Sequence, residues 1–201
     1  QQDYLHTIQR SSATLFQLIS DVLDVSKIEA GQMIVEHQDF CPLELTEDSV
    51  RTYSAFAQAR GLQLYACIDA TLPDRLRGDP LRIRQILNNL LSNAIKFTDN
   101  GRVVLRVRVL ENAQVQWQVS DTGVGISQAQ QQRLFDPFYQ VNDATSQAGA
   151  GLGLAICKWL CELMQGQLRV VSERGLGSSF TLHLALKTVL GSLADCPTFA
   201  P

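Results

Sequence analysis

The chain has 201 residues, 45% of them hydrophobic and 18% charged, and a formal net charge of −3. This length suffices for one ordinary domain plus an appendage, and this hydrophobic content excludes wholesale disorder. The mildly negative charge disfavours nucleic-acid binding, which needs a concentrated basic face, so we expect no nucleic-acid partner. No stretch approaches eighteen uninterrupted apolar residues, the length that would predict a membrane-spanning helix.

The first thirty residues predict one long amphipathic helix. Apolar residues recur mostly three or four positions apart through residues 3–30, which lack Pro and Gly, and Gly31 is a natural helix stop. The resulting apolar seam suits packing against another helix. His6 lies on this helix, but Thr7 follows it where an acidic residue would be needed to take its proton. We therefore expect that His6 does not accept a phosphoryl group.

Helices and strands are interspersed in the rest of the chain. We expect strands at 32–40, 62–68, 102–110, 115–120, 168–172 and 179–186, and helices at 43–60, 79–97 and 151–164. Residues 122–150 lack periodicity and predict a long loop of the kind that covers functional sites. This order predicts an α+β domain, in which three helices cover one face of a mixed, mostly antiparallel sheet, preceded by one long helix.

One face of the helix expected at 79–97 carries a polar stripe. Its members are spaced four, four and three residues apart: Gln85, Asn89, Asn93 and Lys96. A solvated helix face normally carries charged residues, whereas most of these side chains are amides. Amide oxygens can coordinate a hard cation, and a lysine can meet a phosphate. The stripe therefore predicts either a cation and phosphate site or a plain polar surface.

Two glycine-rich stretches flank the long loop. Asp121-Thr-Gly-Val-Gly-Ile126 ends a strand in a carboxylate and then breaks into glycines, which let the backbone approach a flat ligand. Asp121 is placed to accept a hydrogen bond from an exocyclic amine, and the alternative is an ordinary Asp-Thr-Gly turn. Gly149-Ala-Gly-Leu-Gly153 opens a helix, where backbone N–H groups bind anions. Between them, Phe135-Asp-Pro-Phe138 indicates a loop anchored by packing.

Taken together, the polar helix, the two glycine stretches and the phenylalanine pair resemble the catalytic ATP-binding domain of sensor histidine kinases of the hybrid type. That domain belongs to the ATPase superfamily that includes gyrase, the heat-shock chaperones and the mismatch-repair ATPases. The N box, first G box, F box, second G box and last glycine box match residues 89–98, 121–125, 135–138, 149–154 and 175–180. Residues 3–31, ending in Asp24-Val-Ser-Lys-Ile-Glu-Ala-Gly31, resemble the second helix of the dimerisation and phosphotransfer hairpin.

The resemblance implies a two-layer α/β sandwich, the Bergerat-type ATP-binding fold. It divides the chain into part of a dimerisation hairpin at 1–31, a catalytic domain at 32–187, and a tail or linker at 188–201. It implies ATP and Mg²⁺ as cofactors. Asn93, helped by Asn89, would hold the metal against the phosphates, with Lys96 as the third catalytic residue. Asp121 would accept a hydrogen bond from the adenine amine, and Gly125 would leave room for the adenine ring.

The resemblance also carries over a full set of nucleotide-binding positions. These are Asn93, Lys96, Phe97, Asp121, Gly123, Gly125, Ile126, Phe135, Phe138, Gly149, Gly151, Leu152, Gly153, Leu154 and Thr181. The second G box departs from the common pattern, because Ala148 and Ala150 stand where Gly and Thr are usual. One hydroxyl near the phosphates is thereby lost, and we expect slower or looser nucleotide handling.

The implied reaction transfers the γ-phosphoryl group of ATP to a histidine on a helix that this sequence lacks. The implied partners are a second copy of the chain through the dimerisation helices, a receiver domain or response regulator, and other sensor kinases. The implied location is the cytoplasmic portion of a bacterial protein whose full-length parent is anchored in the inner membrane. One alternative is a nucleotide-sensing module without kinase activity. The other is an ATP hydrolase, which is disfavoured because such enzymes use a glutamate at the position of Asn89.

Overall fold

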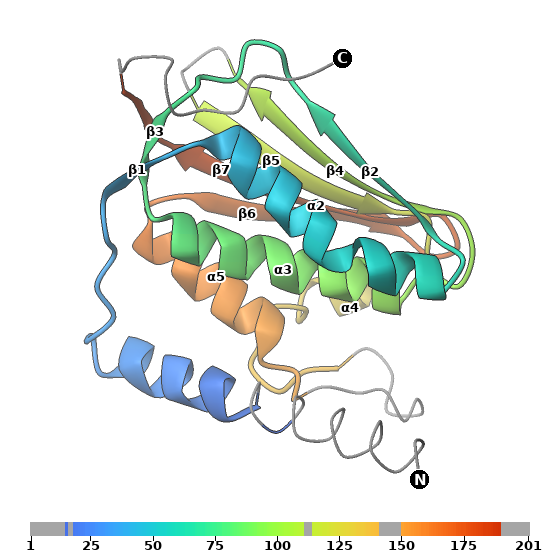
Figure 1. The fold of residues 1–201 in the computed structure, drawn as a ribbon. Helices are drawn as coiled ribbons and strands as arrows, with labels where there is room; N and C mark the ends of the chain where they lie inside the picture. The colour runs from blue at the N-terminus through green and yellow to red at the C-terminus, as the bar shows by residue number, and fades with distance from the viewer. Residues whose placement is uncertain (1–14, 16–17, 111–113, 141–149, 190–201) are drawn as a thin grey trace, which may run out of the picture.

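The structure, a computed structural model, describes residues 15, 18–110, 114–140 and 150–189. The turn expected near residue 111, Gly149 of the second G box, His6 and most of the tail lie outside the described residues. Residues 18–29 form a helix, as expected for this part of the long N-terminal segment, and it lies along the lower edge of the domain (Figure 1). None of the described helices has the length and apolar character needed to cross a membrane.

The main sheet has five strands. In spatial order they are β2 (Gln63–Ile68), β4 (Arg102–Val109), β5 (Gln114–Asp121), β7 (Gly177–Ala185) and β6 (Gln167–Glu173). The pair β2–β4 is parallel, and the other three pairs are antiparallel. A smaller antiparallel sheet joins β1 (Gln38–Phe40), β3 (Leu76–Gly78) and β8 (Lys187–Thr188). The prediction of a mixed, mostly antiparallel sheet is confirmed.

Three helices cover one face of the main sheet, which gives the two layers visible in Figure 1. They are α2 (Pro42–Ala59), α3 (Pro80–Lys96) and α5 (Gly153–Leu163). A single helical turn, α4 (Gln128–Gln131), lies within the segment expected to be a long loop. The expected α+β sandwich is therefore confirmed.

The start of α3 shows why this helix begins where it does. The Asp79 side chain accepts a hydrogen bond from the backbone N–H of Arg82, and Pro80 occupies the first turn, where no N–H is needed. The second carboxylate oxygen of Asp79 accepts from the backbone N–H of Glu36 at 3.0 Å. One capping residue therefore fixes both the helix and the segment that leads in from residues 18–29.

The core lies between the sheet and the helices. Trp117 on β5 is fully buried, and its indole N–H donates to the Thr46 hydroxyl of α2 at 3.2 Å. Val115 and Val119 are buried on the same side of the strand, while Gln116 and Gln118 point to the opposite side. This alternation is the period of two that the sequence pattern predicted.

The shortest elements depart from the sequence prediction. The strand expected at 32–40 is confined to β1, and β3 lies between the strand expected at 62–68 and the helix expected at 79–97, where no strand was predicted. β8 extends into the first residue of the expected tail, and α5 begins two residues later than expected. Strands of two or three residues carry too few positions to show alternation, so tertiary pairing alone defines them.

Candidate functional site

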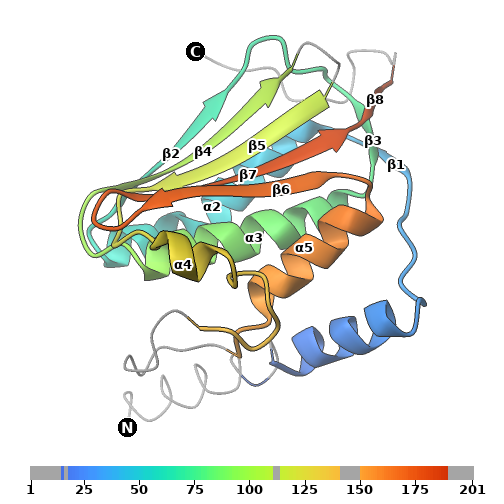
Figure 2. The same cartoon turned by 180° about the vertical axis from the view of Figure 1, so that it is seen from behind.

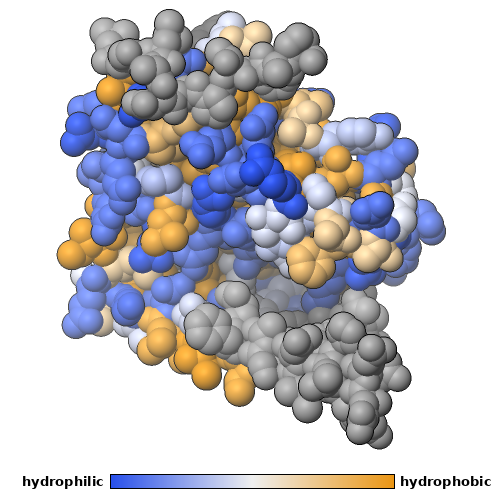
Figure 3. Space-filling view, in the orientation of Figure 1, coloured by the Kyte–Doolittle hydropathy of each residue, from blue (hydrophilic) through white to orange (hydrophobic). Residues whose placement is uncertain are grey.

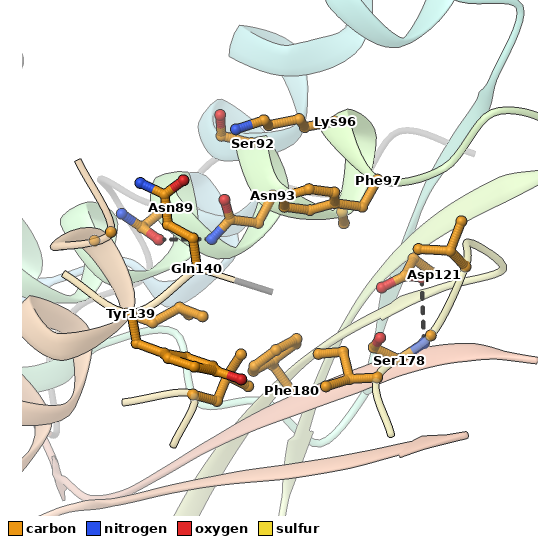
Figure 4. A pocket seen from close by; sticks show the side chains of 18 of the residues that line it. Asn89, Ser92, Asn93, Lys96, Phe97, Asp121, Tyr139, Gln140, Ser178 and Phe180 are labelled. Atoms are coloured by element: carbon orange, nitrogen blue, oxygen red, sulfur yellow. Dashed lines mark hydrogen bonds between the residues drawn. The ribbon is translucent and has the colours of Figure 1, made fainter. Parts of the chain in front are cut away.

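A cavity of about 310 Å³ lies between α3, the loop after β5 and the start of α5 (Figure 4). Residues from distant parts of the chain form its walls: Asp21, Asn89, Ser92, Asn93, Ala94, Lys96, Phe97, Asp121, Val124, Gly125, Ile126, Leu134, Tyr139, Gln140, Gly151, Gly153, Leu154, Ser178 and Phe180. Amide side chains gather at one end and a carboxylate at the other, with aromatic rings between them. The two ends are therefore chemically distinct.

The carboxylate end is built around Asp121, the last residue of β5. Its Oδ1 accepts hydrogen bonds from the backbone N–H groups of Gly123 at 2.9 Å and Ser178 at 3.2 Å. Its Oδ2 has no hydrogen-bond partner among the described residues, and the side chain faces the cavity (Figure 4). Burial raises the pKa of Asp121 above its usual value, although both N–H donors oppose this shift. The free oxygen is an acceptor aimed at whatever fills this end.

Apolar side chains form the walls beside Asp121. Ile126, Leu134 and Phe180 line this part of the cavity together with Tyr139. Leu134 and Phe180 are buried, and Ile126 is packed against the core. A slot with apolar walls and one fixed acceptor suits a flat heteroaromatic ring that carries an amine.

The opposite end is formed by the polar stripe of α3. The Asn93 side-chain N–H donates to Oδ1 of Asn89 at 3.0 Å, so the two amides orient each other. The Asn93 Oδ1 is left for a ligand, and an amide oxygen is a suitable donor for a hard cation such as Mg²⁺. Lys96 lines the same cavity, and burial lowers the pKa of its ammonium group. These groups fit a metal-bound polyphosphate.

One glycine in each G box makes room for another part of the protein itself. A Cβ on Gly153 would overlap the Asn89 side chain, so the start of α5 leaves room for that amide. Gly125 has a φ of +65°, and a Cβ there would overlap the carbonyl oxygen of Glu173. The resemblance implies that Gly125 gives a ligand room. The structure shows in addition a close approach between the loop after β5 and the β6–β7 turn.

The N-terminal helix contributes to the site as well. Asp21 is buried and lines the cavity, and Asp24 accepts a hydrogen bond from Gln85 of α3 at 2.7 Å. A second cavity, of about 460 Å³, lies beside this contact and is lined by residues of both the N-terminal helix and α3. The two cavities share four lining residues, so they meet there: Asp21, Asn89, Ser92 and Gly153. The members of the polar stripe therefore differ in role. Gln85 binds the N-terminal helix at residues 18–29, whereas Asn89, Asn93 and Lys96 line the nucleotide cavity.

Most of the expected nucleotide-binding positions meet at this cavity. Those that line it are Asn93, Lys96, Phe97, Asp121, Gly125, Ile126, Gly151, Gly153 and Leu154, and the catalytic candidate Asn89 lines it as well. Gly123 supports Asp121 from behind, and Leu152 is buried in the core. Phe135 packs partly against the core, whereas Phe138 is 70% exposed. Gly149 lies outside the described residues.

The expectation for Thr181 requires correction. Thr181 pairs with Gln118 across β5 and β7, so both side chains lie on the sheet face that points away from the helices. The neighbouring residue Phe180 points to the inner face and lines the cavity instead. A match made on motif position is off by one residue here, and one residue in a strand reverses the side-chain direction.

Several residues at the site were missed in the sequence. Ser178 and Phe180 follow Gly175-Leu-Gly177, and strand alternation could have marked Phe180 as inward-facing. Tyr139 follows the phenylalanine pair directly. Asp21 gave no local signal, because its place depends on how a separate helix packs against α3.

A fixed acceptor at one end, apolar walls, and amides with a lysine at the other end define a nucleotide-binding domain of the two-layer α+β class. The family model described as "Histidine kinase-, DNA gyrase B-, and HSP90-like ATPase" matches residues 78–188, and the chain belongs to this family.

Curated relatives agree with this assignment. Sensor histidine kinase RcsC of Escherichia coli (strain K12) is 44% identical over 181 residues, which are 89% of this chain and 19% of the relative. Signal transduction histidine-protein kinase BarA of the same organism is 44% identical over 193 residues, covering 92% of this chain and 21% of the relative. The chain thus spans about a fifth of the length of these relatives.

Solved structures share the fold. Full-length ShkA in complex with AMPPNP superposes with a TM-score of 0.84 at 30% identity, covering 95% of this chain and 40% of that one. The Acinetobacter baumannii histidine kinase AdeS gives a TM-score of 0.74 at 20% identity, covering 90% of this chain and 82% of that one. At that lower identity AdeS supports the fold alone.

Proposed function

We propose that this chain is the ATP-binding catalytic portion of a sensor histidine kinase that transfers the γ-phosphoryl group of ATP to a histidine outside the chain. The observation that carries the proposal is that one cavity has the free Asp121 oxygen at one end and the Asn89–Asn93 amide pair at the other. This spacing of acceptor and amides suits the base and phosphates of one nucleotide.

Within this proposal, the protein mainly positions the nucleotide and neutralises its charge. Asp121 accepts a hydrogen bond from the adenine amine, and Asn93 with Asn89 would hold Mg²⁺, which would neutralise charge on the phosphates. Lys96 and the N–H groups at the start of α5 meet the remaining phosphate oxygens. The lone pair of the unprotonated imidazole nitrogen bonds to the γ-phosphorus as the bond from phosphorus to the ADP oxygen breaks, and a base near the acceptor takes the proton from the other ring nitrogen. The second cavity, which opens beside Asn89, offers an approach for that imidazole.

The N-terminal helix fits a role in dimerisation. Val25 and Ile28 pack towards the catalytic domain, whereas Ile19, Val22 and Leu23 are more than half exposed. Apolar side chains lie along the lower edge of the molecule in Figure 3, where this helix runs. An exposed apolar helix face is typical of an interface. We therefore assign residues 1–31 to a dimerisation hairpin, 32–187 to the catalytic domain and 188–201 to a linker, with a receiver domain or response regulator as the downstream partner.

The proposal is tested with the full-length protein and ATP labelled on the γ-phosphate. We expect acid-labile, base-stable phosphoprotein from the full-length protein and none from residues 1–201 alone. Nucleotide binding without transfer in the full-length protein would favour the regulatory alternative, and label on His6 would contradict the assignment of the acceptor. Deleting residues 1–31 should abolish self-association in ultracentrifugation, and ATP should still bind, because the deletion removes only Asp21 from the residues that line the cavity.

A further inference from the structure

The face of the main sheet that points away from the helices, here called the outer face, is visible in Figure 2. Two adjacent rows of side chains cross it, as the strand registers define. One row runs from Arg106 on β4 through Gln118 and Thr181 to Arg169 on β6. The next row runs from Arg108 through Gln116 to His183. The outer face is therefore polar throughout these rows, in contrast to the apolar inner face.

The charge on these two rows has one sign. Arg106, Arg108 and Arg169 are exposed, and neither row contains a carboxylate. Within the part of the chain that the structure describes, no carboxylate forms an ion pair with any of them. The acidic groups nearest in register stand at strand ends: Glu173 ends β6, and Asp69 follows β2 beside Arg108. Hydrogen bonds from Thr71 and, less strongly, the charge of Arg108 lower the pKa of Asp69, so Arg106 and Arg169 carry most of the uncompensated charge. A basic face thus stands on a chain whose formal net charge is −3.

Two polar atoms at the centre of the outer face lack hydrogen-bond partners. The side chains of Gln116 and His183 meet at 2.9 Å through Nε2 of each. Their remaining polar atoms, Gln116 Oε1 and His183 Nδ1, are buried and have no partner among the described residues. By contrast, Gln118 and Ser120 both bond to the Ser179 hydroxyl. A buried polar atom without a partner is destabilising, so this pair is incomplete in the isolated chain.

We propose that the outer face is a docking surface for a partner protein that presents a carboxylate-rich surface. Arginine side chains suit carboxylates because the planar guanidinium group can donate two parallel hydrogen bonds. Gln116 Oε1 is an acceptor that is covered in the isolated chain, so a docked polypeptide supplies its donor when the Gln116–His183 pair turns to expose it. Exposed Tyr65 and Val171 lie in the neighbouring row and add apolar area. A folded protein surface can satisfy all three features together.

The test uses two probes on the isotope-labelled 201-residue chain, followed by NMR. The first is a hexaglutamate peptide with blocked ends, and the second is vesicles of phosphatidylglycerol and phosphatidylcholine in a 1:3 ratio. We expect the peptide to shift amide signals of β4, β5 and β7, and to lose affinity as salt screens the charges. The bound peptide should also raise the pKa of His183, which burial and then Arg169 hold below its usual value.

The variant Arg106→Glu/Arg169→Glu should weaken peptide binding about tenfold or more while leaving ATP affinity unchanged, because neither residue lines the nucleotide cavity. The matched control Arg51→Glu/Lys158→Glu makes the same charge change on α2 and α5 and should leave peptide binding within about twofold. Equal losses in both double variants, or an unmoved His183 titration, would overturn the proposal. Tighter binding to the vesicles than to the peptide, lost in the same variant, would replace the protein partner by a membrane and overturn it as well.

Discussion

Backbone N–H groups hold the carboxylate of Asp121 at the base end of the cavity, whereas at the phosphate end Asn89 and Asn93 hold each other. The donors to Asp121 come from two strand ends of one sheet. The amides instead face Asp21 from a separate helix and Gly153 at the start of α5. The base end is thus completed when the sheet folds, and the phosphate end only when separate segments pack together. Substitutions at the two ends should therefore differ in how they change the stability of the fold and the affinity for the nucleotide.

The largest effect is expected for Gly125→Ala at the base end. The new Cβ would overlap the backbone carbonyl of Glu173, which cannot rotate away, and the φ of +65° adds strain. We expect a loss of about 3 kcal/mol or more in unfolding free energy, and with it ATP binding. Gly61→Ala is the control, since Gly61 has a φ of +70° with no atom near its Cβ position. It should cost only about 1–2 kcal/mol in chemical denaturation.

Asp121→Asn should act on binding and spare the fold. The amide oxygen can keep both backbone N–H bonds, which places the Asn N–H₂ where the free Oδ2 stood. ATP affinity should fall by about 1.5–3 kcal/mol, and the preference over GTP should shrink. Asp69→Asn, the same change on the far side of the protein, should alter neither in calorimetric titration. Unchanged ATP affinity in a folded Asp121→Asn protein would reduce Asp121 to a turn residue.

Asn93→Ala probes the phosphate end. We expect the affinity for Mg²⁺-ATP to fall by about 1–2 kcal/mol, because the Asn93 amide oxygen and the hydrogen bond from the Asn93 N–H to Asn89 are both lost. Adenosine affinity should stay nearly constant, since the base end does not depend on this amide. Asn88→Ala is the control, because Asn88 lines only the second cavity. Equal weakening of both ligands would mean that Asn93 supports the whole site.

The smallest effect is expected for Asp24→Asn, which loosens the docked helix. Asp24 accepts from Gln85 and lies 4.0 Å from Arg82, and its side chain is 14% exposed. Loss of its charge should cost about 0.5–1 kcal/mol and speed amide exchange within residues 18–29. Asp48→Asn breaks a comparable contact to Arg84 that does not involve this helix. Exchange in residues 18–29 that responds equally to both variants would show that the contact through Asp24 does not hold the helix.

The same contrast between the two ends explains what the sequence could reveal. Asp121 and the stripe residues Asn89 and Asn93 were found because each lies on a single strand or helix with its own period. Asp21 was missed because only packing brings it to the cavity. Thr181 was misplaced because motif matching does not track which face of a strand a residue occupies. Local pattern therefore predicted the elements and most of the site, and it failed where separate segments meet.

The connection between β2 and β4 has a consequence for how the protein opens. These neighbouring strands are parallel, and the chain between them runs through β3 and α3. The helix that carries Asn89 and Asn93 is therefore part of the crossover connection between two paired strands. Both of its ends stay anchored to the sheet as long as these strands remain paired. Its amide hydrogens should exchange only when the whole domain unfolds. Those of residues 18–29, which belong to neither sheet, should exchange far sooner. The nucleotide would then rest on the slowest-exchanging part of the molecule, beside one of the fastest.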